Sequence, residues 1–240
     1  MMKIVVFKFI KAKNVKNILF IFGLIVAINL SVSGTGQMSD KIIYNGKVYS
    51  LTGKSVIDGC YPMENYFEKY PDKRPTRGGG TFLRRNYVAT YEIKDNQLYL
   101  NDIEIFDCME LKSVLNEIFP NQESLKIDWL TRLLVIPDGK RNGYGDNERY
   151  IILEINGGNF MREKQIILNI DENFMKESQY SKVTEYELFK KRQYEAFKKT
   201  DEYNKVMDKL KKQRPNWSID DYVELIESGI FGYSSKILVE

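Results

Sequence analysis

The sequence predicts an α+β fold: an antiparallel β-sheet domain with C-terminal helices packed on it, preceded by an N-terminal hydrophobic leader. Three observations lead to this prediction. An apolar run follows a lysine-bearing start, short alternating segments joined by turn residues fill the middle of the chain, and helical periodicity dominates towards the C-terminus. The predicted divisions are a leader at residues 1–36, a strand-rich domain at 41–175 and a helical segment packed on it at 183–240.

The leader has a basic start, an apolar centre and a small-residue exit, which are the three parts of a secretory signal peptide. Residues 1–36 contain five lysines and no acid, and the apolar run covers residues 18–32. An uncleaved leader would instead anchor the protein in the inner membrane through residues 18–36, near the lower limit of roughly 17–25 residues for a span. An ordinary buried helix is the third interpretation. The cleaved and anchored forms both export the domain, to the periplasm, the medium or the outer side of the membrane.

Composition excludes several classes of function. Without the five leader lysines, 31 basic residues face 33 acidic ones, so the remaining chain has no basic surplus for nucleic acid. Histidine is absent, which excludes Ser-His-Asp and Cys-His catalysis and histidine-ligated metals. The two cysteines are too few for a conventional zinc site. We therefore expect no metal and no cofactor.

The predicted sheet begins with a hairpin over residues 41–51, turning at Asn45-Gly46. Residues 52–80 contain three prolines and read as a long irregular loop. A second hairpin follows, with strands at residues 81–93 and 97–106. Helical spacing predicts a helix over residues 109–119, and the remaining strands are predicted at 125–136, 149–155 and 165–170.

Capping signals place the helices of the C-terminal part. Thr184 and Glu187 have capping-box spacing and predict a helix that continues to residue 214. Ser218 and Asp221 predict a second, shorter helix, and residues 236–239 read as a final strand. The apolar stripe on the long helix has near-heptad spacing, which fits either dimerisation or, as favoured here, the covering of one sheet face. Its members are Phe189, Ala196, Tyr203, Met207 and Leu210.

Two segments resemble a recurring pattern in a group of uncharacterised bacterial proteins. The first is RNYVATYEI at residues 85–93 followed by LYL at 98–100, and the second is WLTRLLVIPDGK at 129–140. The resemblance covers residues 81–155 and implies strand-and-turn structure. The group has no assigned activity, so no chemistry is implied. Members carry a histidine-containing stretch after the second segment, where this chain has NGYG at residues 142–145.

A basic, glycine-rich stretch is the best local candidate for a site. Successive glycine N–H groups can form a concavity for an anion, and arginine grips carboxylate or phosphate with two hydrogen bonds. The alternative is a flexible loop with solvated charges. The candidate anion-binding residues, close to Lys73, are Arg74, Arg77, Gly78, Gly79, Gly80, Arg84 and Arg85.

Three further features have a functional and a structural interpretation each. Carboxylates around Trp129 and Tyr144 could serve glycan hydrolysis or lie scattered on the surface; they are Asp128, Asp138, Asp146, Glu148 and Glu154. Tyrosines of the second hairpin could form a ligand platform or, as favoured here, pack across strands; they are Tyr87, Tyr91 and Tyr99. In an oxidising compartment Cys60 and Cys108 would either form a disulfide or remain thiols.

These observations favour an exported or membrane-tethered interaction module of the cell envelope, with an envelope protein or glycan as partner. A carboxylate-based glycan hydrolase is the first alternative, and a structural or immunity-type envelope protein is the second. No recognisable catalytic set of residues points to an enzyme. The sequence does not determine the oligomeric state.

Overall fold

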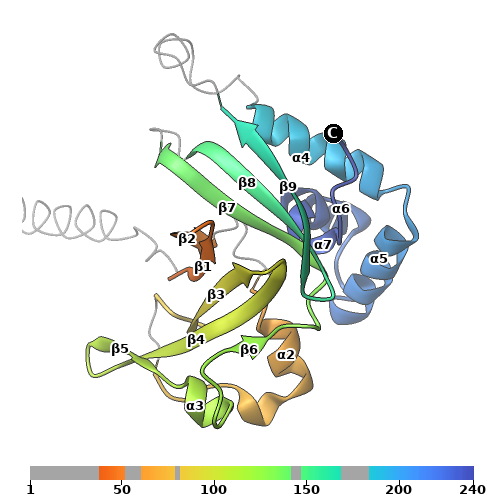
Figure 1. Cartoon of the computed structure of the whole chain (residues 1–240). Coiled ribbons are helices and arrows are strands. Elements are labelled where there is room, and N and C mark those ends of the chain that lie inside the picture. Colours follow the sequence, from red (N-terminus) through yellow and green to blue (C-terminus); the bar gives the residue numbers. More distant parts are fainter. Residues whose placement is uncertain (1–37, 52–60, 79–81, 142–146, 169–183) are drawn as a thin grey trace, which may run out of the picture. The chain divides into compact units, whose positions relative to one another are not determined.

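A mostly antiparallel sheet of nine strands forms the body of the structure, and C-terminal helices pack on it (Figure 1). The computed structural model describes residues 38–51, 61–78, 82–141, 147–168 and 184–240. The predicted leader lies outside these ranges. Among the described residues, no helix has the length and hydropathy needed to cross a membrane. The predicted α+β class is confirmed.

The sheet has the order β2-β1-β3-β4-β9-β8-β7, with β5 and β6 also paired to β4. The strands are β1 (Asp40–Tyr44), β2 (Lys47–Leu51), β3 (Val88–Lys94), β4 (Gln97–Asp107), β5 (Glu110–Ser113), β6 (Leu125–Lys126), β7 (Arg132–Arg141), β8 (Asn147–Asn156) and β9 (Asn159–Ile167). The helices are α2 (Glu64–Lys69), the 3-10 helix η1 (Pro71–Lys73), α3 (Leu115–Ile118), α4 (Glu185–Phe197), α5 (Asp201–Gln213), α6 (Ile219–Ser228) and α7 (Ile230–Tyr233).

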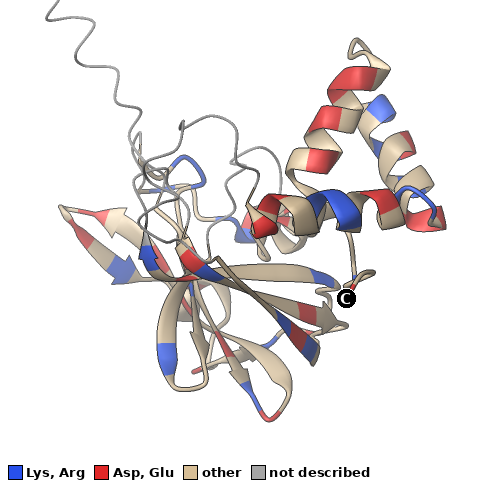
Figure 2. Ribbon diagram, turned by 90° about the horizontal axis from the view of Figure 1, so that it is seen from above, with Lys and Arg blue, Asp and Glu red and all other residues tan. Residues whose placement is uncertain are grey.

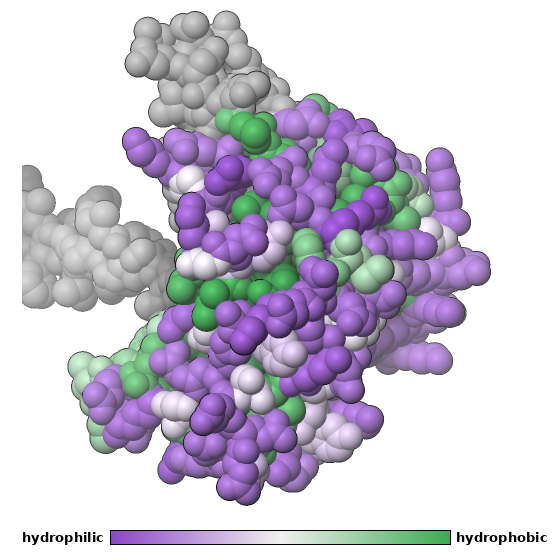
Figure 3. Space-filling model, viewed as in Figure 1, coloured by the Kyte–Doolittle hydropathy of each residue, from purple (hydrophilic) through white to green (hydrophobic). Residues whose placement is uncertain are grey.

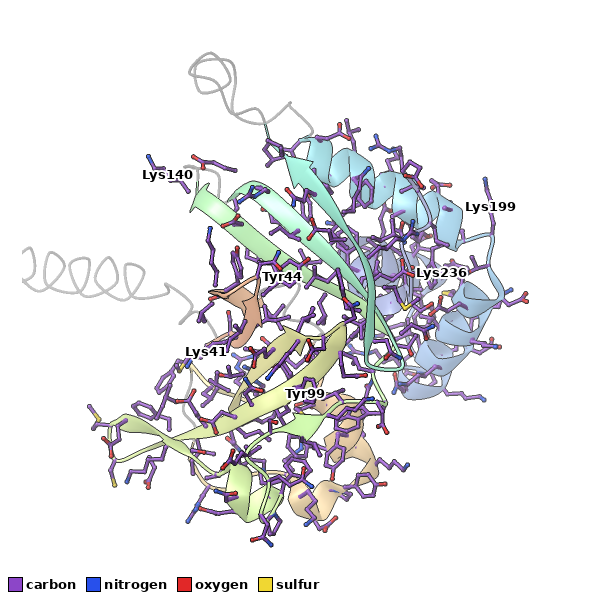
Figure 4. The ribbon with its side chains drawn as sticks, viewed as in Figure 1. Lys41, Tyr44, Tyr99, Lys140, Lys199 and Lys236 are labelled. Atoms are coloured by element: carbon purple, nitrogen blue, oxygen red, sulfur yellow. The ribbon has the colours of Figure 1, made fainter. Side chains whose placement is uncertain are left out.

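The sheet is curled. Its two end strands, β2 and β7, pack against each other. One pairing departs from the antiparallel pattern, since β1 runs parallel to β3. Strands β4 and β9 pair only at Gln97 and Asn159, so the two halves of the sheet join at one corner. In Figure 4, Tyr44 of β1 points into the space beside β9, where its hydroxyl donates a 2.6 Å hydrogen bond to Glu163.

Two hydrophobic cores use opposite faces of the same strands. Leu134 of β7 faces the first core, inside the curl, whereas the adjacent Leu133 faces the second core under the C-terminal helices. Neighbours in β8 alternate in the same way, with Ile151 in the first core and Ile152 in the second. Because both faces of β8 are covered, its sequence is an almost continuous apolar run rather than an alternating one.

The turns of both predicted hairpins are confirmed. Asn45 and Gly46 have φ of 50° and 72°, and Asp95 and Asn96 have φ of 50° and 57°. Two successive positive φ values match the twist of the flanking strands, and Asn, Asp and Gly tolerate them best. The first hairpin pairs β1 with β2 and the second pairs β3 with β4.

Several predicted elements of the central region are wrong in type or extent. The predicted helix at 109–119 is strand β5 followed by the single-turn α3, because Glu110–Ser113 completes a hairpin on β4. The predicted loop at 52–80 contains α2 and η1. The strand predicted from residue 81 begins at Val88, after a turn region, and the strand predicted at 125–136 is divided into β6 and β7.

The C-terminal region differs from its prediction at two places. The long predicted helix breaks into α4 and α5, because Thr200 caps a new helix by accepting a 3.2 Å hydrogen bond from the Tyr203 amide. The predicted strand at 236–239 is irregular chain, held in part by the Ile237 amide bonding to Glu154 at 2.9 Å. The predicted cap at Ser218 is confirmed, with a complete capping box to Asp221.

The α4 part of the predicted stripe covers the sheet, since α4 packs against β9, and the α5 part joins the second core. Phe189, Met207 and Leu210 belong to the second core together with residues of β7 and β8. Charged residues of both signs are interspersed over the sheet and the helices (Figure 2). Figure 3 shows hydrophobic surface in a band across the middle of one face, and Val48 of β2 is 66% exposed.

Candidate functional site

A pocket of about 270 Å³ lies between the segment that follows α2 and the part of the chain formed by β4, β5 and α3. The first wall comprises residues 72–77, which include the end of η1 and the loop after it. The second wall is apolar apart from Glu117, and its other members are Ile105, Val114 and Ile118. The pocket therefore combines a mainly basic wall with an apolar one.

Proline and glycine shape the basic wall. Pro71 stands at the first position of η1, where its fixed φ suits the helix and its missing N–H is not needed. Gly78 has φ of +80°, and a Cβ there would lie 2.8 Å from the carbonyl oxygen of Phe106 in β4. Only glycine allows the loop to approach β4 so closely. Gly78 thus has a packing role beside the pocket, while Gly79 and Gly80 lie outside the described residues.

Arg77 and Glu117 form an ion pair on the rim of the pocket. The Arg77 guanidinium donates to both oxygens of Glu117, with the longer contact at 2.6 Å. The side chains are 62% and 59% exposed. An ion pair this exposed contributes about 0–1 kcal/mol, so another anion can take the place of Glu117 at little cost.

Arg74 forms a less exposed ion pair than Arg77 does, with Glu64 as its partner. Its Nη1 and Nη2 donate to the two oxygens of Glu64 at 3.2 and 2.6 Å, and this hydrogen bonding raises the pKa of Arg74. The Tyr87 hydroxyl donates to the same carboxylate at 2.7 Å. Burial raises the pKa of Tyr87 well above its usual value, which keeps this phenol a donor. Arg74 is thereby oriented, and its charge is largely compensated.

Lys73 is the cation of the basic wall with the weakest partner. Its Nζ donates a long hydrogen bond, 3.4 Å, to the carbonyl oxygen of Ile118 across the pocket. Lys73 forms no ion pair with any of the described carboxylates. An anion that enters the pocket would therefore find Lys73 able to bind it without losing a carboxylate partner.

Arg85 lies apart from the pocket. Its guanidinium pairs with Asp40 at 2.6 Å and stacks on Tyr61, 3.6 Å from the ring centroid. Its side chain is only 9% exposed. Of the predicted anion-binding set, Arg74 and Arg77 line the pocket. Gly78 packs against β4 next to it, and Arg85 is part of a buried ion pair. Arg84 is not among the residues that line the pocket.

Of the carboxylates proposed for glycan hydrolysis, Asp138 and Glu148 lie at the same end of the β7–β8 pair, and Glu154 lies towards its other end. Asp138 pairs with Arg149 across β7 and β8. Burial acts to raise the pKa of Asp138, but its hydrogen bonds and the charge of Arg149 lower it overall. Glu154 accepts from Arg162 and from the Ile237 amide. Asp128 is exposed, Glu148 accepts from the Lys140 amide at 3.1 Å, and Asp146 lies outside the described residues.

The aromatic residues mainly pack. Tyr87 and Tyr91 are fully buried, which agrees with packing rather than a ligand platform, although the ring of Tyr87 packs against Phe67 of α2; Tyr99 is half-buried. Trp129 is half-buried against Tyr66, with ring centroids 4.9 Å apart. These contacts use the rings for packing and not as an open platform for a ligand.

The predicted disulfide falls partly outside the described residues. Cys108 is an exposed free thiol in the turn between β4 and β5, and Cys60 lies outside the described residues. The pairing of the two cysteines stays a prediction. The described ranges hold no group of three metal-ligating side chains.

Sequence reasoning missed the second wall of the pocket. The sequence predicts Ile105 only as a strand residue and places Val114, Glu117 and Ile118 in one helix. No short-range signal joins these residues to a loop about 30 to 45 positions earlier in the chain. Only the tertiary pairing of β5 with β4 places them opposite Arg74 and Arg77.

Comparisons with protein-family models, with curated proteins and with solved structures give no match for this chain. The resemblance noted for residues 81–155 stays a prediction.

Proposed function

We propose that this chain is a binding module of the cell envelope, exported by its leader or tethered through it. In this proposal the pocket beside η1 holds the anionic group of a ligand. The observation that supports it most is the combination of Lys73, which has no carboxylate partner among the described residues, with the exposed and replaceable Arg77–Glu117 pair. Both cations stand on one wall of one pocket.

Binding would proceed by exchange of carboxylates. Glu117 occupies the guanidinium of Arg77 in the way that a ligand carboxylate or phosphate would. An incoming anion would replace Glu117 at Arg77 and gain a second cation at Lys73. Glu117 would return to solvent, which costs little because it is already 59% exposed.

No specific observation favours the hydrolase alternative. Asp40 is the one described carboxyl group with a raised pKa, about 6, and it is fully buried. A general acid must reach its substrate, whether directly or through one water. Asp40 instead bonds to Arg85 and to the Ala89 amide. Binding therefore explains the described residues better than catalysis does.

Isothermal titration of the full-length protein with inorganic phosphate and with acetate tests the proposal. We expect the Lys73→Met, Arg77→Gln double variant to weaken binding about ten- to a hundredfold, the range for loss of charge-assisted hydrogen bonds. Lys69→Gln is the matched control, because Lys69 is exposed on α2 and does not line the pocket. We expect Glu117→Gln to strengthen binding, because it removes a competing anion. Equal affinities in all four proteins would reject the pocket as the site.

The proposed location has its own test. The intact, non-reduced mass of the protein from membrane, periplasmic and cytosolic fractions distinguishes the forms. A shortened soluble species would establish secretion, and a full-length species in the membrane would establish tethering. Full-length protein confined to the cytosol would reject both.

A further inference from the structure

The apolar wall of the pocket restricts which anions fit it well. Ile105, Val114 and Ile118 belong to the first hydrophobic core and are 1%, 5% and 7% exposed, so the apolar wall offers only a small area to a ligand. A bare inorganic anion would leave that small apolar area uncovered, and an entirely apolar ligand would leave Lys73 and Arg77 unused. The two walls together fit a negative group attached directly to a small hydrophobic group.

The size of the pocket suits the end of a chain rather than a whole cofactor. Its volume is about 270 Å³, whereas pockets for drug-sized ligands occupy about 300–1,000 Å³. A carboxylate together with one branched aliphatic side chain has a volume of the order that this pocket can hold. At the rim, the side chains of Arg77 and Glu117 are more than half exposed, so the rest of a long ligand can continue into solvent.

We propose that the pocket receives the C-terminal carboxylate of a partner polypeptide whose last side chain is a branched aliphatic one. Lys73 and Arg77 would bind the carboxylate, and Ile105, Val114 and Ile118 would contact the last side chain. Capture of a C-terminal carboxylate is a recurrent mode of peptide recognition, usually by backbone N–H groups; here two side-chain cations would take that role. This inference rests on the proposed function, since it names the partner class of the same site.

Peptides that differ in one group test the inference without changing the protein. The probes are acetyl-Gly-Ser-Gly-Ser-Leu with a free carboxylate, the same peptide as its C-terminal amide, and the free acid that ends in Asp. We expect the first peptide to bind the full-length protein about tenfold or more tightly than the amide, which loses the charge-assisted hydrogen bonds. The Asp-ending peptide should bind more weakly than the Leu-ending one, because its second carboxylate would face the apolar wall.

Protein variants check that the effect arises in this pocket. Lys73→Met should remove the preference for the free acid over the amide, and Lys69→Gln should retain it. Val114→Thr keeps the side-chain volume nearly unchanged and should reduce the preference for Leu over Asp. Circular dichroism of each variant would confirm that its fold is unchanged. If a variant fails to fold, the peptide series on the unaltered protein still tests the inference.

Two small anions separate this inference from the proposed function. If phosphate binds in a Lys73-dependent manner while the acid and amide peptides bind equally, the peptide inference is wrong and the anion pocket stands. If isovalerate binds as tightly as the Leu-ending peptide, the ligand is a small branched carboxylate and the inference is again overturned. If neither phosphate nor any peptide binds, both proposals fall.

Discussion

Asp40 and Arg85 form an ion pair inside the protein, with the Asp40 carboxylate fully inaccessible and an Nη2–Oδ1 distance of 2.6 Å. The same oxygen accepts the Ala89 amide at 2.8 Å, and the Tyr91 hydroxyl lies 3.3 Å from the other oxygen. Asp40 begins β1, and Ala89 and Tyr91 belong to β3. The pair therefore fixes the parallel contact between these strands.

Replacement of Asp40 by alanine should destabilise the fold severely. The change leaves the guanidinium of Arg85 buried without its counter-charge, which typically costs about 3–5 kcal/mol. The control is Glu104→Gln, because Glu104 pairs with Lys41 at 2.8 Å while both side chains still reach solvent, 19% and 37% exposed. Ion pairs with access to solvent contribute about 0–1 kcal/mol. Urea unfolding of the three proteins measures the difference. Equal losses for the two variants would contradict the assigned role of the buried pair.

The same carboxyl group should make stability depend on pH. Burial raises the pKa of Asp40 to about 6, against the lowering effect of Arg85, whereas an unfolded Asp titrates near about 3.9. Between these values the folded state holds more protons than the unfolded state. This contribution to stability is therefore complete below about pH 4 and is lost as the pH rises through about 6. Asp40→Asn has no titrating group at this position. The free energy of unfolding of the unaltered protein minus that of Asp40→Asn, measured in urea at each pH, therefore isolates the effect. A difference that rises with pH would contradict the prediction.

Glu64 should stabilise the basic wall of the pocket. Glu64→Gln removes the charge that binds Arg74 and leaves the Tyr87 hydroxyl with a weaker acceptor. We expect a loss of about 1–3 kcal/mol in the free energy of unfolding, the range for hydrogen bonds to charged groups. Arg74→Met should cost a similar amount, and the double variant should cost clearly less than the sum. Additive losses would show that Glu64 and Arg74 act independently.

Gly78 offers a test of how the pocket is built. Gly78→Ala places a Cβ 2.8 Å from the Phe106 carbonyl oxygen at φ of +80°, so the loop must move away from β4. Gly46→Ala is the matched control, because Gly46 has φ of +72° but nothing within 4 Å of the added atom. Both variants should lose about 1 kcal/mol from the positive φ. Gly78→Ala should lose more and also weaken phosphate binding, which calorimetry can measure; equal behaviour would contradict the packing role.

Local chemistry made parts of the fold predictable. Asn45-Gly46 specifies its turn by backbone geometry alone, and Ser218 with Asp221 specifies a helix start, because both signals act within four residues. Prediction failed at residues 109–119, where helical spacing of apolar residues competed with strand pairing. The pairing of Glu110–Ser113 with β4 decided the outcome, and that interaction is not encoded in the segment itself.

Only the basic wall of the candidate site could be predicted from the sequence, because its residues are neighbours in the chain and their partners are not. The basic residues Arg74 and Arg77 stand close together in the sequence and were recognised as a group. Their carboxylate partners, Glu64 and Glu117, are 10 and 40 residues away, and Asp40 is 45 residues from Arg85. Charge pairing at such distances depends on the fold. A run of arginines therefore indicates where negative charge is needed without showing whether the chain supplies it.

The position of a bound anion tests the central claim most directly. Crystals of the protein soaked in selenate, which resembles sulfate and phosphate, would locate the ion by anomalous scattering. We expect one ordered selenate between the Nζ of Lys73 and the guanidinium of Arg77, with Glu117 turned away from Arg77. An unchanged Arg77–Glu117 pair with no ion in the pocket, at concentrations that saturate binding in solution, would contradict the account.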